Sequence, residues 1–320
     1  PPPPPPAYHS EDGIRDDLEG LVGSEMCIRD RLRIDNDNFG RLYEQVRATA
    51  YVAHPYQNPV IGWPSDIENW TQDDLEVFFK TYYAPNNQTI VFAGDVTPEE
   101  IYLLAEQYLS PIPRQHPPPE ISTIEPPQQG ERRVLVETAA QAPLLHMAFH
   151  AGATADEDTL HLDLLLAVLA EGDSSRLHRL LVEEDGLALQ VSGWQSDGFD
   201  PGLAYFAMTL PPGADIDAAE ARLFAELERV AAEGVTSAEL AKARNLRIAA
   251  FWRGLQTIDG KASAIGNFEV FTGDYENLFA IPEKLSNISS DQLQAVAAKV
   301  FRRTNMTVGV LRAPVIGGDE

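Results

Sequence analysis

The chain has 320 residues, 44% of them hydrophobic, which is enough apolar side chain to build one large or two medium domains. Its formal net charge of −25 argues against nucleic acid or an anionic membrane as a partner. A solvated acidic surface explains this charge, and a basic peptide substrate is also compatible with it. One cysteine excludes an internal disulfide framework, and no apolar run reaches the roughly 18 residues of a membrane span.

The first 31 residues do not read as part of a protein fold. Residues 1–6 are six prolines, a low-complexity run that builds no core. Residues 11–30, EDGIRDDLEGLVGSEMCIRD, resemble a translated sequencing-library adapter, with both adapter ends present in the right order. The alternative is an ordinary polar N-terminal segment. We therefore expect residues 1–31 to be a non-native segment and the native sequence to begin near Leu32.

The next part of the chain predicts mixed α and β structure followed by a linker. Residues 87–96 are a short apolar run that ends in Gly-Asp, which is typical of a strand entering a turn. Residues 97–109 predict a helix, because Thr97 and Glu100 have the spacing of a capping box. Residues 111–131 are rich in proline and predict an extended, semi-rigid interdomain linker.

The residues after the linker predict a second α+β region. Strands are expected at 132–138, 143–150, 187–196, 202–210 and near 305–312, and helices at 157–170, 174–184 and 215–234. In the last of these helices one apolar stripe carries Ile216, Leu223, Phe224, Leu227 and Val230. A further capped helix is expected to follow, with Thr236 and Glu239 as its capping box.

An internal repeat indicates two domains of similar build. Residues 69–92 align without a gap on residues 287–310, at a constant offset of 218. Matched positions include asparagines and hydroxyl residues as well as apolar ones, and each copy predicts a capped helix, a polar turn and a strand. A chance likeness of two helix–turn–strand units is the alternative.

The repeat also predicts that the first domain is incomplete. Residues 132–286 precede the second copy, whereas residues 32–68 alone precede the first, which leaves the first domain about 120 residues short. The expected fold class is α+β, with two homologous domains, each a mainly antiparallel sheet covered by helices. We place the first at 32–110 and the second at 132–313, with a tail at 314–320. The incomplete domain should expose apolar surface and make the chain prone to aggregate.

Several motifs resemble one family of peptidases. They are Asp35-Asn36-Asp37, His54-Pro55-Tyr56, Ile61-Gly62, Tyr83-Ala84-Pro85-Asn86-Asn87, Gly94-Asp95, and GDSSRLHRLLVEEDGLAL at 172–189. Together they resemble the pitrilysin/insulinase-type zinc metallopeptidases, the inverzincins, as bacterial relatives of mitochondrial processing peptidase. The resemblance covers about 280 residues and matches both domains in order.

The resemblance implies zinc chemistry that this chain does not carry. In the family a helical H-x-x-E-H places two imidazoles on one Zn²⁺, its glutamate acts as general base, and a downstream glutamate is the third ligand. No H-x-x-E-H occurs in residues 1–320. We therefore assign no catalytic, metal or substrate-binding residue here, and expect zinc in the intact parent protein but none in this chain.

Other polar residues have plainer interpretations. His146 and His150 fall on one face of an expected strand, where a metal site is conceivable but no acidic partner follows. His54, before a proline, is interpreted as a loop-packing residue, and His178 as a surface residue. Ser174 and Ser175 lie beside Asp173 and His178, but one helical segment cannot present nucleophile, base and orienting group together, so we interpret them as helix-capping residues.

One departure bears on the type of subunit. In the family's partner halves an arginine seven residues before a tyrosine holds the substrate backbone, and here those positions are Val182 and Leu189. The resemblance therefore implies a zinc-bearing type of subunit, which works on peptides or unfolded proteins with a homologous Arg/Tyr subunit. The expected function is a fragment of a zinc-dependent metalloendopeptidase, inactive as given. The alternatives are a non-catalytic structural subunit of the processing-peptidase or respiratory-complex core-protein type, and an unrelated α+β pair. Bacterial cytoplasm and periplasm both stay open.

Overall fold

The computed structural model describes residues 30–314, and its centre is a five-stranded sheet. The strand order is β1-β5-β2-β4-β3, where β1 and β5 are parallel and the other neighbours are antiparallel. The strands are β1 Arg132–Glu137, β2 Leu144–His150, β3 Gln190–Gln195, β4 Leu203–Thr209 and β5 Met306–Arg312. The expected α+β class, the mainly antiparallel sheet and these five strands are confirmed.

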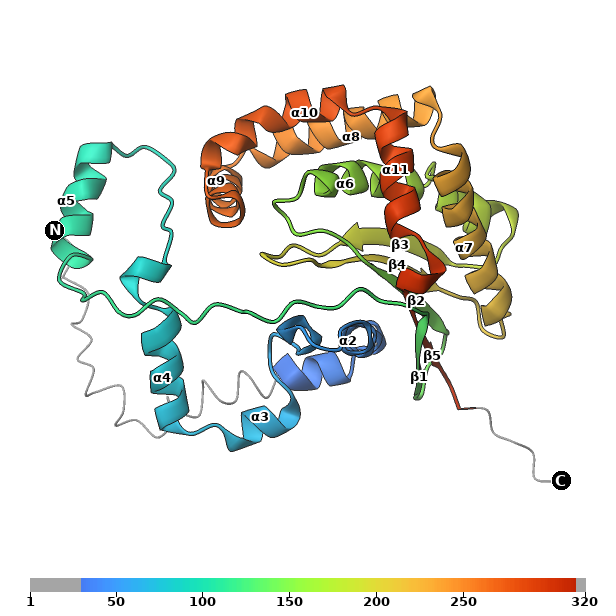
Figure 1. Cartoon of the computed structure of the whole chain (residues 1–320), viewed down its shortest axis with the longest axis horizontal. Helices are drawn as coiled ribbons and strands as arrows, with labels where there is room; N and C mark the ends of the chain where they lie inside the picture. The colour runs from blue at the N-terminus through green and yellow to red at the C-terminus, as the bar shows by residue number, and fades with distance from the viewer. Residues whose placement is uncertain (1–29, 315–320) are drawn as a thin grey trace.

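Helices cover one face of this sheet (Figure 1). The helices α6 Glu157–Ala170, α7 Ile216–Glu233 and α11 Ser290–Val300 contribute core residues on this face. Beyond them, α8 Ser237–Gly254 packs on α6, and α9 Ile258–Thr272 and α10 Ile281–Asn287 pack on α8. The predicted stripe of α7 lies in the core, with Leu223, Leu227 and Val230 fully buried. The capping box of Thr236 and Glu239 starts α8 as expected. Burial of these apolar stripes is the main force that holds the helical layer on the sheet.

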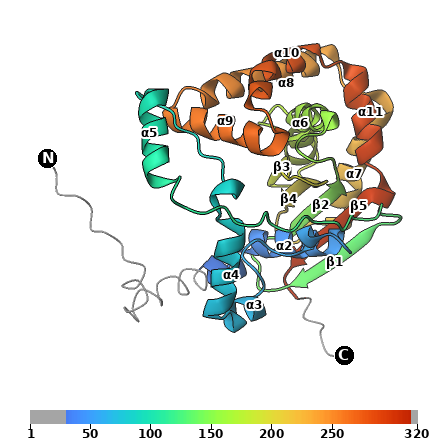
Figure 2. The same cartoon turned by 60° about the vertical axis from the view of Figure 1, so that its left-hand side comes forward.

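The opposite face is covered by α2, Asn38–Ala50 (Figures 1 and 2). Asp37 caps this helix by accepting hydrogen bonds from the N–H groups of Phe39 and Gly40. Leu42 and Val46 of α2 are fully buried against the sheet. This packing was not expected, because the predicted boundaries place residues 32–110 in a domain of their own.

The contact between α2 and β5 is unusually close at Gly309. A Cβ atom at this position would overlap the side chain of Val46 and lie 3.0 Å from that of Leu42. Arg41 adds a polar tie by donating to the Thr138 hydroxyl, at 2.9 Å, just beyond β1. A side chain at residue 309 would therefore push α2 off the sheet.

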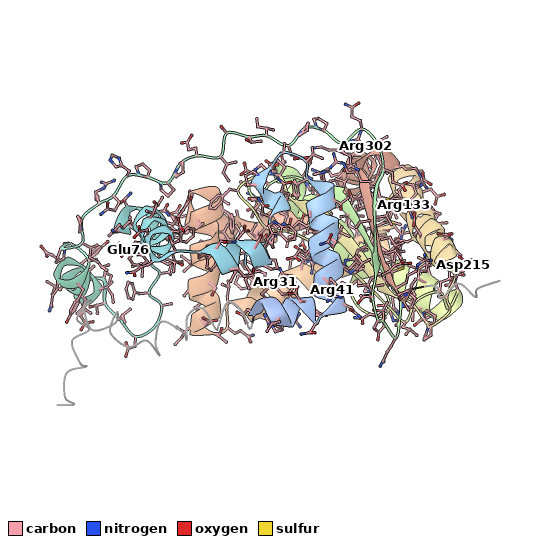
Figure 3. All side chains as sticks on the ribbon, turned by 90° about the horizontal axis from the view of Figure 1, so that it is seen from below. Arg31, Arg41, Glu76, Arg133, Asp215 and Arg302 are labelled. Atoms are coloured by element: carbon pink, nitrogen blue, oxygen red, sulfur yellow. The ribbon has the colours of Figure 1, made fainter. Side chains whose placement is uncertain are left out.

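The chain enters α2 through a short helical segment at 30–35. Arg31 is buried there and donates to the carboxylates of Glu44, at 2.6 Å, and Asp35, at 2.6 Å. Figure 3 shows Arg31 and Arg41 beside these first helical turns. Arg31, which the sequence assigned to the non-native segment, thus belongs with the folded part. The adapter-like residues up to 29 and the tail from 315 lie outside the described residues.

Residues 64–109 form three helices away from the sheet in Figure 1. These are α3 Pro64–Asn69, α4 Gln72–Tyr82 and α5 Pro98–Tyr108, and the predicted capping box of Thr97 and Glu100 starts α5. The strand predicted at 87–96 is wrong: this segment carries no strand. A strand needs a neighbour to accept its hydrogen bonds, and no strand described in residues 30–314 pairs with this segment.

The repeat is visible in the elements themselves. The helices α4 and α11 start and end at positions 218 residues apart, and so do two single 3₁₀ turns, Pro85–Asn87 and Arg303–Asn305. Both helices begin with a capping box, Thr71 with Asp74 and Ser289 with Gln292. The two copies therefore share local structure as well as sequence. Across the described part of the chain, no helix combines the length and apolarity that a membrane crossing requires.

Candidate functional site

We first consider α6 as a zinc site, because it carries a histidine and acidic side chains in its first turns. Its His161 is buried and lies 3.7 Å from the Asp158 carboxylate. A second zinc-binding imidazole would have to follow four residues later, where the fully buried Leu165 stands in the apolar core. Within residues 30–314 no group of three or more His, Cys, Asp or Glu side chains is arranged to hold a metal ion. The residues that the structure describes do not fit a zinc ion.

The two β2 histidines lie on one face of the strand, as predicted, and this face lies under α2. His146 is fully buried, and neither ring nitrogen has a hydrogen-bond partner. Its ring packs edge-on against Phe39 of α2 at 4.7 Å, and burial lowers the pKa of His146 to about 4. His150 lies 2.9 Å from the carbonyl oxygen of Ala50, the last residue of α2. The two imidazoles hold α2 rather than a metal.

The loop after α2 is fixed by a carboxylate of the linker. Glu125 accepts hydrogen bonds from the backbone N–H groups of Val52, Ala53 and His54, each at 2.9 Å. Burial opposes the charge, but these donors outweigh it and lower the pKa of Glu125. Nothing in the sequence marks Glu125, because its partners are backbone groups of a distant loop.

His54 lies in the same joint and has the packing role that was expected. It is buried, its Nδ1 accepts the Tyr56 N–H at 3.2 Å, and its Nε2 lies 3.3 Å from the Asp200 carboxylate. Further along the linker, Gln128 donates to the carbonyl oxygen of Met306 in β5 at 2.7 Å. Residues 111–131 contain no helix or strand beyond their first turn, and Gln128 joins the end of this segment to β5.

A cavity of about 590 Å³ opens between residues 123–128, the end of β2, the start of α6 and the end of α11. Its volume is in the range of small-molecule sites. Its polar lining includes His54, Glu125 and His150, which are already engaged in the joint, and Lys299, which pairs with Asp158 at 2.5 Å. Each of these four side chains already has its own polar partner, and none of them forms a pair of nucleophile and general base.

The serine and histidine cluster of residues 173–178 forms no catalytic arrangement. The helical segment there is a π-helix over His178–Glu184. Ser175 is buried and its hydroxyl lacks a hydrogen-bond partner, while the Ser174 hydroxyl contacts Lys242. The predicted capping role of the two serines is therefore wrong: the helix begins at Arg176, directly after Ser175, but neither serine hydroxyl accepts a backbone N–H from its first turn. His178 is partly buried and lies 3.9 Å from Asp173, which corrects its placement on the open surface.

Comparison with known proteins places the chain in a family. The description "Peptidase M16 inactive domain" matches residues 69–247, which is more than half of the chain. The chain belongs to the peptidase M16 family of metallopeptidases, as its resemblance to the pitrilysin/insulinase type implied.

Individual relatives agree with this assignment. The chain is 28% identical to the zinc protease PqqE of Helicobacter pylori over 287 residues, which cover 88% of this chain and 64% of that protein. The crystal structure of a protease from Helicobacter pylori matches with a TM-score of 0.86 and 27% identity, over 92% of this chain and 72% of that one. The chain thus spans somewhat less than two thirds of the length of this curated relative.

One further structural match shows the fold alone. A chain of complex III2 from Candida albicans matches with a TM-score of 0.74 at 14% identity, over 90% of this chain and 70% of that one. The fold therefore occurs in a chain whose name is that of a protease and in a chain of complex III2, whose name is not. Val182 packs against the core, and Leu189 is exposed.

Proposed function

We propose that this chain supplies the second domain and the last part of the first domain of a zinc-dependent metalloendopeptidase. The observation that carries the proposal is the repeated unit: residues 72–87 repeat residues 290–305 element by element, yet their apolar side chains are exposed. In the second copy, helices α6 and α7 and the neighbouring strands cover the matching side chains. A comparable layer, carrying the zinc site, would complete the first copy.

The role of the present residues in that enzyme is structural and substrate-enclosing. Peptides or unfolded proteins would be cleaved by zinc-activated water held in the completed first domain. The second domain would close the chamber from the other side. The absence of the Arg/Tyr pair at Val182 and Leu189 favours a separate homologous subunit that supplies it.

A non-catalytic subunit of the same fold is the second candidate. The matched family description is that of an inactive domain, and the fold is shared with a chain of complex III2. Such a subunit would keep the two-domain architecture and lack the zinc ligands in both domains.

A long sequencing read through the codons upstream of Leu32 discriminates the two. An in-frame H-x-x-E-H about 70–80 codons before a glutamate that lies just upstream of Leu32 is the expected result for a zinc peptidase. If the upstream codons encode the rest of the first domain but the H-x-x-E-H residues are replaced, the non-catalytic subunit becomes the better assignment. In parallel, the present chain after purification should hold no stoichiometric zinc and should not hydrolyse a fluorogenic peptide. Bound zinc with zinc-dependent hydrolysis would contradict the assignment of roles.

A further inference from the structure

The contact between α2 and the sheet encloses two imidazoles with different surroundings, beside the apolar side chains of Leu42 and Val46. His146 is fully buried between α2 and the sheet and has no hydrogen-bond partner at either nitrogen. His150, four residues further along β2, meets the Ala50 carbonyl at the C-terminal end of the same helix. An imidazole that is buried without a partner accepts a proton poorly, because the charged form loses its hydration and gains nothing in return.

The groups that face His146 cannot compensate a positive charge. They are Phe39 of α2, Trp194 of β3, and Ala207 and Gly309, which pair with His146 across β4 and β5. None of these side chains is ionisable, and burial alone accounts for the lowered pKa of His146. The tyrosines that stack near Trp194, Tyr43 and Tyr205, stay neutral in acid.

The surroundings of His150 include charges of both signs. Burial lowers the pKa of His150, and so does Arg132 of β1, while the Ala50 carbonyl and Glu125 of the linker raise it. Tyr51, which follows α2, packs edge-on against its ring at 5.2 Å. The net shift is downward, so both β2 imidazoles are neutral when α2 is docked at neutral pH.

We propose that His146 and His150 make the docking of α2 acid-labile, so that α2 and the loop of residues 51–57 leave the sheet when the two imidazoles take up protons. Once exposed, an imidazole titrates near 6.5, so the released form gains protons that the docked form refuses. Docking is therefore fully stable above about pH 6.5 and weakens as the pH falls toward 4. Since α2 anchors residues 64–109 to the sheet, acid would loosen the joint between the two parts of the chain.

Hydrogen exchange of the whole chain tests this proposal. After correction for the intrinsic exchange rate, the opening equilibrium of residues 38–50 should rise about 40-fold between pH 6.5 and 4.5 for His146 alone, and more for two imidazoles. Amides of α7 and α11, in the core on the other face of the sheet, should show no such rise. The range stops at pH 4.5 because protonation of Glu125 would loosen the same loop below it.

Variants assign the effect to these side chains. His146→Phe should reduce the pH dependence of α2 opening to the part that His150 contributes, and His150→Gln should also reduce it while keeping an amide donor for the Ala50 carbonyl. His116→Gln, at an exposed position in the linker, is the matched control and should keep the slope of the native chain. Equal slopes for α2 and α7 in the native chain, or an unchanged slope in His146→Phe, would overturn the proposal.

A second measurement covers the case that a variant fails to fold. In the native chain, the imidazole proton resonances of His146 should not titrate between pH 7.5 and 5.5 while α2 stays protected. A His146 that titrates near pH 6.5 with α2 still docked would refute the mechanism.

Discussion

The two copies of the repeated unit form the same helix but differ in what surrounds it. In α11, Leu293, Val296, Ala297 and Val300 are 0–5% exposed, whereas the matching residues of α4, Leu75, Phe78, Phe79 and Tyr82, are 40–62% exposed. The residues that follow α11 form β5, which pairs with β1 and β2, while those that follow α4 form no strand. A helix satisfies its own backbone groups and can be capped locally, but a strand depends on its neighbours.

The largest expected effect tests whether the two copies differ in how much their buried side chains contribute to the free energy of unfolding. Leu293→Ala removes a fully buried side chain and should lower the free energy of unfolding by about 2–5 kcal/mol. The matched change Leu75→Ala, at a half-exposed position, should lower it by less than about 1 kcal/mol. Urea denaturation of both variants measures the difference. Equal losses would mean that α4 is as well covered in solution as α11.

The next comparison exchanges a glycine and a valine. Gly309 of β5 corresponds to Val91 in the first copy, and β5 needs the glycine because α2 lies directly upon it. Gly309→Val should destabilise the protein by about 1–3 kcal/mol through overpacking and should increase exchange of the α2 amides. Val91→Gly should leave the thermal midpoint of the sheet within about 2 °C of the native value. A stable Gly309→Val variant with α2 still protected would show that α2 is not seated there.

A smaller effect is expected at the helix caps. Ser289→Ala removes the cap of α11 and should cost about 1 kcal/mol of global stability, because α11 is part of the sheet's helical layer. Thr71→Ala removes the equivalent cap of α4 and should loosen α4 alone. Urea denaturation measures the global loss in Ser289→Ala, and amide exchange measures the local opening of α4 in Thr71→Ala. A global loss in Thr71→Ala equal to that in Ser289→Ala would tie α4 to the cooperative core.

The smallest effect concerns pH at the same caps. Hydrogen bonds with Thr71 lower the pKa of Asp74, whereas the corresponding Gln292 does not ionise. The carboxylate therefore stabilises α4 above its usual titration range, and this contribution is lost as the pH falls through the lowered pKa. After correction for the intrinsic exchange rate, opening of the first-turn amides should increase in acid for α4 but not for α11, and Asp74→Gln should remove the difference. If Asp74→Gln still opened in acid, another ionisable group than Asp74 would be responsible for the acid effect.

The sequence predicted the elements whose signals are local. Capping boxes located α5 and α8, and the apolar stripe at 216–230 located the buried side of α7. The family also followed from sequence motifs. The strand at 87–96 was predicted from composition and is wrong, because composition does not reveal whether a neighbouring strand is present.

Long-range packing was the part that the sequence did not reveal. The pattern of α2 shows that it is amphipathic, but not that its apolar side meets β5 or that Gly309 makes room for it. The strand alternation correctly placed His146 and His150 on one face, yet the helix above that face could not be foreseen. The contacts of Glu125 were missed for the same reason, since they join positions more than 70 residues apart.

The seating of α2 on the sheet changes where this chain can be divided. A cut in the proline-rich linker would look natural from the sequence, but a fragment that starts at residue 132 would expose the apolar face that α2 covers. It would also expose His146 and Gly309, which α2 covers, to water. A piece that joins residues 30–58 to residues 121–314 keeps the packing on both faces of the sheet and leaves out the helices α3, α4 and α5. For expression or crystallisation, a short bridge in place of residues 59–120 is therefore a better design than truncation at the linker.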